Sequence, residues 1–531
     1  MLRTHLSILF VASLSALAQP SPSPEAKAYS EANRLKDPVN KLVGLEKFVT
    51  DFPKGGIYLR IAYSEILRLR LKAPGDPAST ARLRSYRALI EDAIPKIEAE
   101  GGGQSTFVLT AAEEFLDAKL PPKESEFWSR KALALVDEAA YKSDLIQAMK
   151  NAKPAPSDSF VQSQFASFKA QRLSVLGRAL LARGKRGKAQ QSFEQALKLS
   201  ATDAAALNGL AQIADQRNQP KQALDYSAAA ILSGKPKPET RAIFARRIGT
   251  EDGEAFLDNV YKAKFPNPIP HGILTRNKIE AKRVVLAEVF TGAGCPPCVA
   301  ADLAFDGVIE SYNTNEVAIL MHHLHVPRPD PLSNPDTVDR FKYYGGRGVP
   351  TYTLDGKTAS GGGTREMAQG FFTELRPKID AALSIPNQGA LKIDLSSTGN
   401  LLEVKVQSQS SANPRQKLWI AIAEKQVRYS GENGVRFHPL VVRSMKSFEI
   451  QPTNSATHTA VFDLTAIEAG LKTYLDAFEE SSERFGKTQF LAKPLGLSAT
   501  NMTAVAFLED SESKTILSTV VFTPKGATAS Q

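Results

Sequence analysis

Apolar residues recur at helical spacing through the first half of the chain, in Ala- and Leu-rich stretches from about residue 28 to residue 261. Short segments rich in Gly and Pro interrupt these stretches, for example DFPKGG at residues 51–56 and AKPAPS at residues 152–157. This pattern predicts a succession of helices joined by turns. We expect a helical domain over residues 27–262.

Two neighbouring segments of this region match one another at an offset of 34 residues. The matched positions are Leu176, Gly177, Ala189, Ala196 and Leu197 in the first copy, and Leu210, Ala211, Ala223, Ala230 and Ile231 in the second. This period, with small residues where paired helices approach closely, is typical of tetratricopeptide repeats. Because one repeat cannot bury its own apolar face, we expect an all-α tetratricopeptide-like solenoid.

The pattern changes after a Pro-rich segment at residues 263–278. A strand, a helix, a second strand and a closing helix are expected at residues 284–290, 298–312, 317–326 and 366–383. A strand, a helix and a strand at this spacing indicate a parallel βαβ unit. We therefore expect an α/β domain over residues 279–387.

From residue 390 onward apolar and polar residues alternate with the period of a β-strand. Leu402, Val404 and Val406 share one face, whereas Glu403 and Lys405 lie on the opposite face. Further apolar runs occur at residues 419–423, 459–464, 503–508 and 516–522, and a predicted helix at residues 466–480 interrupts them. Several short strands at this spacing predict a C-terminal β-sandwich over residues 388–526. The fold class we expect is therefore multidomain.

The composition is that of an ordinary globular protein. The chain has 531 residues, of which 42% are hydrophobic and 23% charged, and this excludes wholesale disorder and a multi-span membrane protein. The formal net charge is +10, but no block of five or six consecutive Lys or Arg residues occurs. Spread basicity of this kind does not indicate nucleic-acid binding, and we expect no nucleic-acid partner.

Residues 1–18 have the features of a signal peptide. Arg3 supplies a positive start, an apolar core follows, and Ala16-Leu17-Ala18 forms a small-residue cleavage site. The alternative is a buried N-terminal helix. No later stretch reaches the ~20 apolar residues that a membrane span requires. We expect export across the inner membrane to the periplasm, or an association with the outer membrane, where the environment is oxidising.

The chain has two cysteines, and they form one motif, Cys295-Pro296-Pro297-Cys298. The motif follows a predicted strand and opens a predicted helix, which is the context of a redox-active pair. Helix N-termini stabilise a thiolate, and a second thiol one turn on can attack a mixed disulfide. Three alternatives stay open: a structural disulfide, a half-complete soft-metal site, and a domain with only a scaffolding role.

Two segments, FTGAGCPPCVAADLAF and HLHVPRPDPLSNPDTVDRFKYYGGRGVPT, make residues 279–387 similar to the thioredoxin superfamily. They resemble a group of exported bacterial thioredoxin-like proteins, some of them associated with the outer membrane. Residues 423–445 resemble the β-rich domain that accompanies the thioredoxin unit in that group. The resemblance implies that Cys295 is the attacking thiol, Cys298 the resolving thiol, and Pro350 the cis-proline that faces the active site.

Two positions depart from the family pattern. Gly294 replaces the aromatic residue often found before the first cysteine, which predicts a more open or less apolar site. The position of the family's buried acid is Val289, with Glu288 one residue earlier. If a bulge restores the phase, Glu288 is a candidate to relay a proton to Cys298; the alternative is a strand-end carboxylate with no catalytic part.

Three histidines, His322, His323 and His325, follow the motif in the predicted second strand. His323 and His325 share one face of the strand, whereas His322 points away. Two histidines and the two thiolates are candidates to bind copper or zinc, and histidines beside the motif are candidates to tune the thiol pKa. The ordinary alternative is that they are packing residues. We expect neither a metal nor another cofactor at this site.

These features favour an extracytoplasmic thiol–disulfide oxidoreductase that acts on protein thiols and disulfides. The repeat domain would recruit a partner protein or peptide, unless it is a stiff spacer. The alternative function is an envelope interaction scaffold with a non-catalytic thioredoxin-like domain. The motif does not set the direction of electron flow, since reductases, oxidases and isomerases share it.

Overall fold

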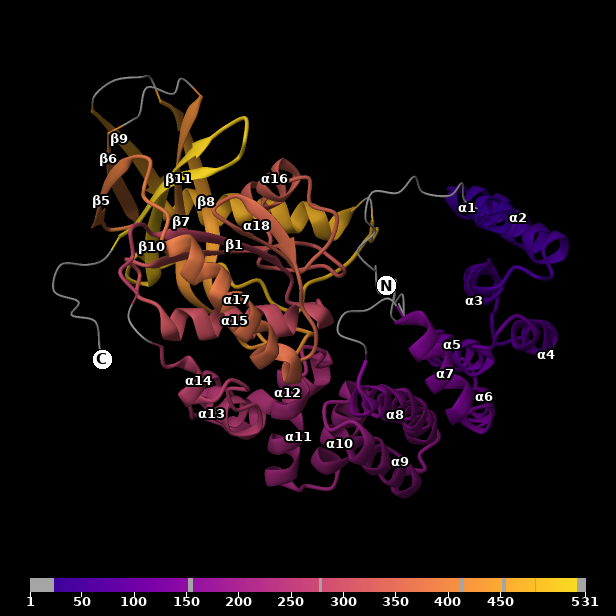
Figure 1. Cartoon of the computed structure of the whole chain (residues 1–531). Helices are drawn as coiled ribbons and strands as arrows, with labels where there is room; N and C mark the ends of the chain where they lie inside the picture. Colours follow the sequence, from indigo (N-terminus) through magenta and orange to yellow (C-terminus); the bar gives the residue numbers. More distant parts are fainter. Residues whose placement is uncertain are drawn as a thin grey trace. The chain divides into compact units, whose positions relative to one another are not determined.

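The computed structural model describes residues 23–150, 156–276, 279–409, 415–450, 455–482 and 484–522. The expected signal peptide at residues 1–18 lies outside them. The described chain divides into two compact units (Figure 1). The helical unit extends to Ile231 and includes Lys235–Gly253, and the sheet unit comprises Leu232–Gly234 and the chain from Glu254 onward. Within these residues no helix has the length and apolar character needed to cross a membrane.

The helical unit begins with seven helices; the first six share one apolar core, and Leu145 of the seventh packs in a separate cluster with Val161. These are α1 (Pro24–Arg34), α2 (Pro38–Asp51), α3 (Ile57–Lys72), α4 (Thr80–Ala99), α5 (Gln104–Asp117), α6 (Pro122–Ala134) and α7 (Glu138–Ala148). Side-chain caps start several of them, and the Asp37 carboxylate accepts the Asn40 N–H at 2.8 Å at the start of α2. The expected helical N-terminal region is confirmed.

The matched segments found at the 34-residue offset form four consecutive helices. The helices of this part are α8 (Asp158–Ala182), α9 (Arg186–Leu199), α10 (Ala204–Gln216), α11 (Pro220–Leu232) and α12 (Pro238–Ile248). The ring of Phe193 on α9 lies against Gly177 of α8 and Gly209 of α10, and a Cβ at either glycine would overlap it. Small residues therefore stand where these helices approach most closely.

The sheet unit is built around the predicted βαβ unit. Strands β1 (Val285–Thr291) and β2 (Val317–His323) pair in parallel, and α15 (Val299–Ser311) joins them. The remaining elements of this part are α13 (Gly253–Lys264), α14 (His271–Leu274), η1 (Pro296–Cys298), α16 (Pro335–Tyr343), β3 (Thr351–Leu354), β4 (Lys357–Ser360), η2 (Arg365–Met367) and α17 (Ala368–Leu383). Apolar residues of β1, β2, α15 and α17 form one core.

The C-terminal part of the sheet unit is rich in strands. Its elements are β5 (Ala390–Thr398), β6 (Leu401–Gln409), β7 (Gln416–Arg428), β8 (Phe437–Glu449), β9 (Ala456–Asp463), α18 (Leu464–Glu480), η3 (Ala499–Asn501), β10 (Met502–Asp510) and β11 (Ile516–Val521). Strands β5, β6 and β9 form a three-stranded sheet. Its apolar face shares a core with β7 and β10.

Strands from both sides of residue 387 pair into one mixed sheet of eight strands. The order is β11-β10-β7-β8-β2-β1-β3-β4, and the junction is a parallel contact of Met321 on β2 with Val441 on β8. A mixed β-sheet region at the C-terminal side of the helices is therefore confirmed. The predicted boundary at residue 387 separates segments that share this sheet.

Candidate functional site

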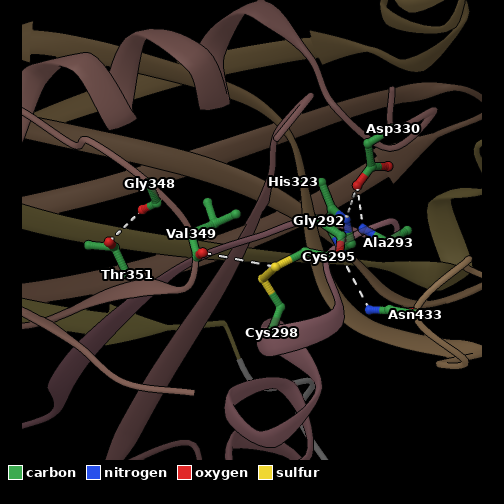
Figure 2. Close-up of a disulfide and its surroundings, with 10 residues drawn as sticks. All are labelled: Gly292, Ala293, Cys295, Cys298, His323, Asp330, Gly348, Val349, Thr351 and Asn433. Carbon is green, nitrogen blue, oxygen red and sulfur yellow. Dashed lines mark hydrogen bonds and ion pairs between the residues drawn. A yellow bond between two sulfur atoms is a disulfide. The ribbon is translucent and has the colours of Figure 1, made fainter. Parts of the chain in front are cut away.

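The two cysteines lie at the junction of β1 and α15 and form a disulfide. The sulfur atoms are 2.04 Å apart and the Cα atoms 5.3 Å apart. Cys295 caps the short helical turn η1, which Pro296 and Pro297 open and which continues into α15. Figure 2 shows Cys298 at the start of this helix. The motif thus has the strand–turn–helix context that the sequence predicts.

Pro350 lies at the start of β3, next to the disulfide. The Val349–Pro350 peptide bond is cis, as the resemblance implied. The Sγ of Cys295 is 4.0 Å from the carbonyl oxygen of Val349 (Figure 2). At Gly362 a Cβ would overlap both Pro297 and Pro350, so the backbone of three segments converges on the motif.

Both cysteines are buried, with 0% of their surface exposed. The sequence predicted that Gly294 makes the site more open or less apolar. The site is not more open, because the side-chain stem of Arg328 packs against Gly294. Arg328 forms an ion pair with Glu432 at 3.0 Å. Asn433 donates its backbone N–H to the carbonyl of Ala293 at 3.0 Å. The site is thus closed, and its cover beside Ala293 and Gly294 is polar.

A buried carboxylate, Asp330, holds the loop before Cys295 in place. It accepts the N–H of Ala293 at 2.6 Å and lies 2.9 Å from Nδ1 of His323 (Figure 2). Burial opposes its ionisation, but His323 and the N–H donors outweigh burial and keep the pKa of Asp330 below its usual value. Asp330 was not predicted from the sequence, because its loop has no periodicity and its contact with Ala293 is tertiary.

The three histidines do not point to one centre. His322 lies 3.4 Å from the carboxylate of Glu288, His323 lies beside Asp330, and the ring of His325 stacks on Phe478 at 3.7 Å between centroids. Among the residues that the structure describes, no three His, Cys, Asp or Glu side chains are grouped so that they could hold a metal ion. The histidines are packing and hydrogen-bonding residues, and the expectation of no cofactor stays a prediction.

Glu288 lies on the opposite side of the sheet from the cysteines. Its β1 neighbours Ala287 and Val289 face α15 and α17, whereas Glu288 receives two hydrogen bonds from Arg340 of α16, at 2.7 and 2.8 Å. The sheet therefore separates it from Cys298. The proposed proton relay through Glu288 has no structural basis, because no bulge shifts β1 into the required phase.

The arginine sets the ionisation of Glu288. Burial raises the carboxyl pKa, but the charge and hydrogen bonds of Arg340 outweigh burial and hold the pKa of Glu288 well below its usual range. Tyr344 donates to the same carboxylate at 2.6 Å. Glu288 is therefore a fully paired, ionised group, which suits a structural role.

Two acids that the sequence analysis missed lie on the cysteine side of the sheet. Asp302 and Asp306 follow Cys298 by four and eight residues on α15. Burial raises the pKa of Asp302 to about 7, and desolvation raises that of Asp306 to about 8. The spacing in CVAADLAFD was the signal that could have identified them, since it places these side chains on one helix face.

Comparison with known proteins does not assign the chain to a family. No protein-family model matches it, and no curated protein matches it. A crystal structure of an Agrobacterium tumefaciens protein, solved in a structural genomics programme, matches 48% of this chain and 100% of its own chain, with 13% identity and a TM-score of 0.29. At this TM-score the similarity carries no argument about fold or function.

Proposed function

We propose that the protein is a thiol–disulfide oxidoreductase in which Cys295 and Cys298 form the reactive pair of a thioredoxin-like domain. The observation that carries the proposal is the disulfide between the chain's two cysteines at the start of α15, with the Val349–Pro350 segment against Cys295. Helix N-termini favour a thiolate at this position. Because we expect the protein to be exported, we propose that the reaction takes place in an extracytoplasmic compartment.

The two thiols of the motif supply both electrons of the exchange reaction. In the reduced protein, the Cys295 thiolate attacks one sulfur of a substrate protein disulfide, and one substrate thiolate leaves. The Cys298 thiolate then attacks the Cys295 sulfur, and the second substrate thiolate leaves. Two electrons have moved to the substrate, and the protein holds the Cys295–Cys298 disulfide. The same steps in reverse oxidise a substrate dithiol, and either direction suits the site.

The helical unit is proposed to recruit the partner. The tetratricopeptide-like period and the Phe193 packing between Gly177 and Gly209 support a stack of helix pairs. Arrays of this kind present extended surfaces to peptides and proteins. The proposed partner is therefore a protein that carries thiols or a disulfide.

One observation favours the second candidate function, an interaction scaffold with a permanently closed disulfide. Neither cysteine has exposed surface, and a substrate sulfur must approach Cys295 along the S–S axis. Access then requires the segments packed around the motif, including the one in which Arg328 lies against Gly294, to move. In an oxidoreductase these segments move under native conditions, and in a scaffold they do not.

A trapping experiment separates these two functions. Reduced Cys298→Ala protein is mixed, under native conditions, with a peptide that carries an intramolecular disulfide. The oxidoreductase proposal expects a stable adduct through Cys295 with the full mass of the peptide, and no adduct from the matched Cys295→Ala control. An adduct that forms in denaturant only would favour the scaffold and overturn the proposal.

A further inference from the structure

Three acidic residues follow Cys298 along α15 at intervals of four. They are Asp302, Asp306 and Glu310, and this spacing places them and Cys298 on one face of the helix. Their exposure increases along the helix, since Cys298 is 0% and Asp302 6% exposed, Asp306 is partly exposed and Glu310 is exposed. The row therefore leads from the buried disulfide to solvent.

The Asp302 carboxyl has no hydrogen-bond partner on either oxygen in the described structure. The nearby Thr291 hydroxyl favours the ionised form of Asp302, but its effect is smaller than that of burial. An unpaired carboxylate in a buried position is costly, so such a group takes up a proton readily. Buried carboxylates are normally paired, as Glu288 and Asp330 are here. Asp302 is therefore built to exchange a proton rather than to hold a charge.

Burial and the charged neighbours bring the pKa values of Asp302 and Asp306 close to neutral pH. Burial raises the pKa of Asp302 to about 7, with His323 lowering it and Asp330 raising it. Desolvation raises the pKa of Asp306 to about 8, with the charges of Asp302 and Glu310 raising it further and Arg365 of η2 lowering it. Groups with such pKa values both accept and release protons efficiently at neutral pH.

We propose that Asp302, Asp306 and Glu310 form the path along which the proton of Cys298 travels between the buried pair and solvent. The inference rests on the proposed function. When Cys298 attacks the mixed disulfide, its thiol proton passes to the Asp302 carboxylate, then to Asp306, and leaves at Glu310. When the disulfide is reduced, the departing Cys298 thiolate takes a proton back from the Asp302 carboxylic acid. Asp302 thus takes the role for which Glu288 was a candidate in the sequence.

Single-turnover reaction of the reduced protein with 2,2′-dithiodipyridine tests the path. Attack by Cys295 releases one thiopyridone, and attack by Cys298 on the mixed disulfide releases the second, so the two steps are followed separately by absorbance. We expect Asp302→Asn to slow the second step at pH 7 by about 10- to 100-fold. The first step stays within about twofold, because this thiolate depends on the helix terminus.

The pH profile distinguishes proton transfer from a structural effect. In the wild type the second step levels off above pH 7, whereas in Asp302→Asn it rises about tenfold per pH unit up to the thiol pKa. Asp306→Asn, which alters a less buried position, slows the second step by less, and Glu310→Gln by less again. The control Asp339→Asn, whose side chain is 76% exposed on α16, leaves both steps unchanged.

Each outcome has one meaning. A wild-type second-step rate and pH profile in Asp302→Asn, with the first step intact, would overturn the proton path and leave the oxidoreductase standing. Loss of the first step in the native wild type would instead remove the proposed function. If Asp302→Asn does not fold, Asp306→Asn decides, since an unchanged pH profile in that variant also contradicts the path.

Discussion

Each face of the sheet around β1 holds a buried carboxyl group, and the pKa values of the two groups are shifted in opposite directions. On the α16 face Glu288 is 0% exposed and bonded to Arg340 and Tyr344. On the α15 face Asp302 is 6% exposed and has no hydrogen-bond partner in the described structure. The pKa of Glu288 is lowered and that of Asp302 is raised to about 7. The difference comes from partners, since both groups are buried.

The paired face holds the sheet together. Arg340 lies between Glu288 on β1 and Glu509 on β10, and its Nη1 donates to Oε2 of Glu509 at 3.2 Å. The indole N–H of Trp419 on β7 donates to Glu509 at 2.8 Å. This cluster joins strands that are far apart in sequence. A buried charge with complete partners fixes structure, whereas an unpaired one next to a disulfide is free to take part in chemistry.

The largest effect is expected from Glu288→Gln, which breaks the paired face. Removing one partner of a buried ion pair leaves Arg340 incompletely compensated, so the free energy of unfolding at pH 7 should fall by about 3–5 kcal/mol. Because the folded pKa of Glu288 is lowered, this loss is complete above pH 4 or so and shrinks as the pH falls below that value.

Urea unfolding in a Trp128→Phe background measures this change. The chain has two tryptophans, and Trp419 then reports on the sheet unit alone. The matched control is Glu449→Gln, whose side chain is 73% exposed and which should change stability by less than about 0.5 kcal/mol. Equal effects of the two substitutions would contradict the structural role of the Glu288 cluster.

Asp302→Asn should change the free energy of unfolding in the opposite direction and increase it. The pKa of Asp302 is raised in the folded state, so ionising it costs stability as the pH rises. That cost is absent below about pH 4 and complete once the pH exceeds about 7. Between pH 4 and pH 8 the variant should therefore gain stability relative to the wild type, on the order of 2–4 kcal/mol.

The same fluorescence assay, repeated at several pH values, checks this gain. Asp339→Asn is the matched control, and its difference from the wild type should stay small at every pH. A constant difference between Asp302→Asn and the wild type from pH 4 to pH 8 would mean that Asp302 is not a strained buried acid.

The smallest effect is expected from Glu432→Gln, which sharpens the contrast by loosening the cover of the α15 face. Arg328 and Glu432 are both about one-third exposed, at 38% and 32%, so their pair contributes at most about 1 kcal/mol. Reduction of the disulfide by dithiothreitol should accelerate by up to about fivefold. Salt should shrink the difference between variant and wild type; a slower reduction in the variant would show that the pair does not restrain access.

Much of the fold could be predicted from local periodicity. The helical and two-residue periods predicted the helical N-terminal region and most strands, and the position of the motif between β1 and α15 followed from its neighbours. Strand β8 was missed, because Arg443 and Lys446 break its alternation. Its parallel pairing with β2 joins residues that are more than a hundred positions apart, and no local pattern records such a contact.

The acids show the same limit at the site. Consecutive residues of a strand face opposite sides, so the single step between Glu288 and Val289 decided which face the carboxyl reached. The helical spacing of Asp302 from Cys298 was visible in the sequence. Its lack of a partner was not, because the surroundings of Asp302 come from β1, β2 and the loop that carries Asp330.

The most direct test of the central claim is an equilibrium titration of the native protein in glutathione redox buffers, with the thiols counted by a mass tag. The oxidoreductase proposal predicts that Cys295 and Cys298 open and close together, reversibly, while tryptophan fluorescence shows that the protein stays folded. A disulfide that resists every native buffer and opens only when the protein unfolds would contradict it.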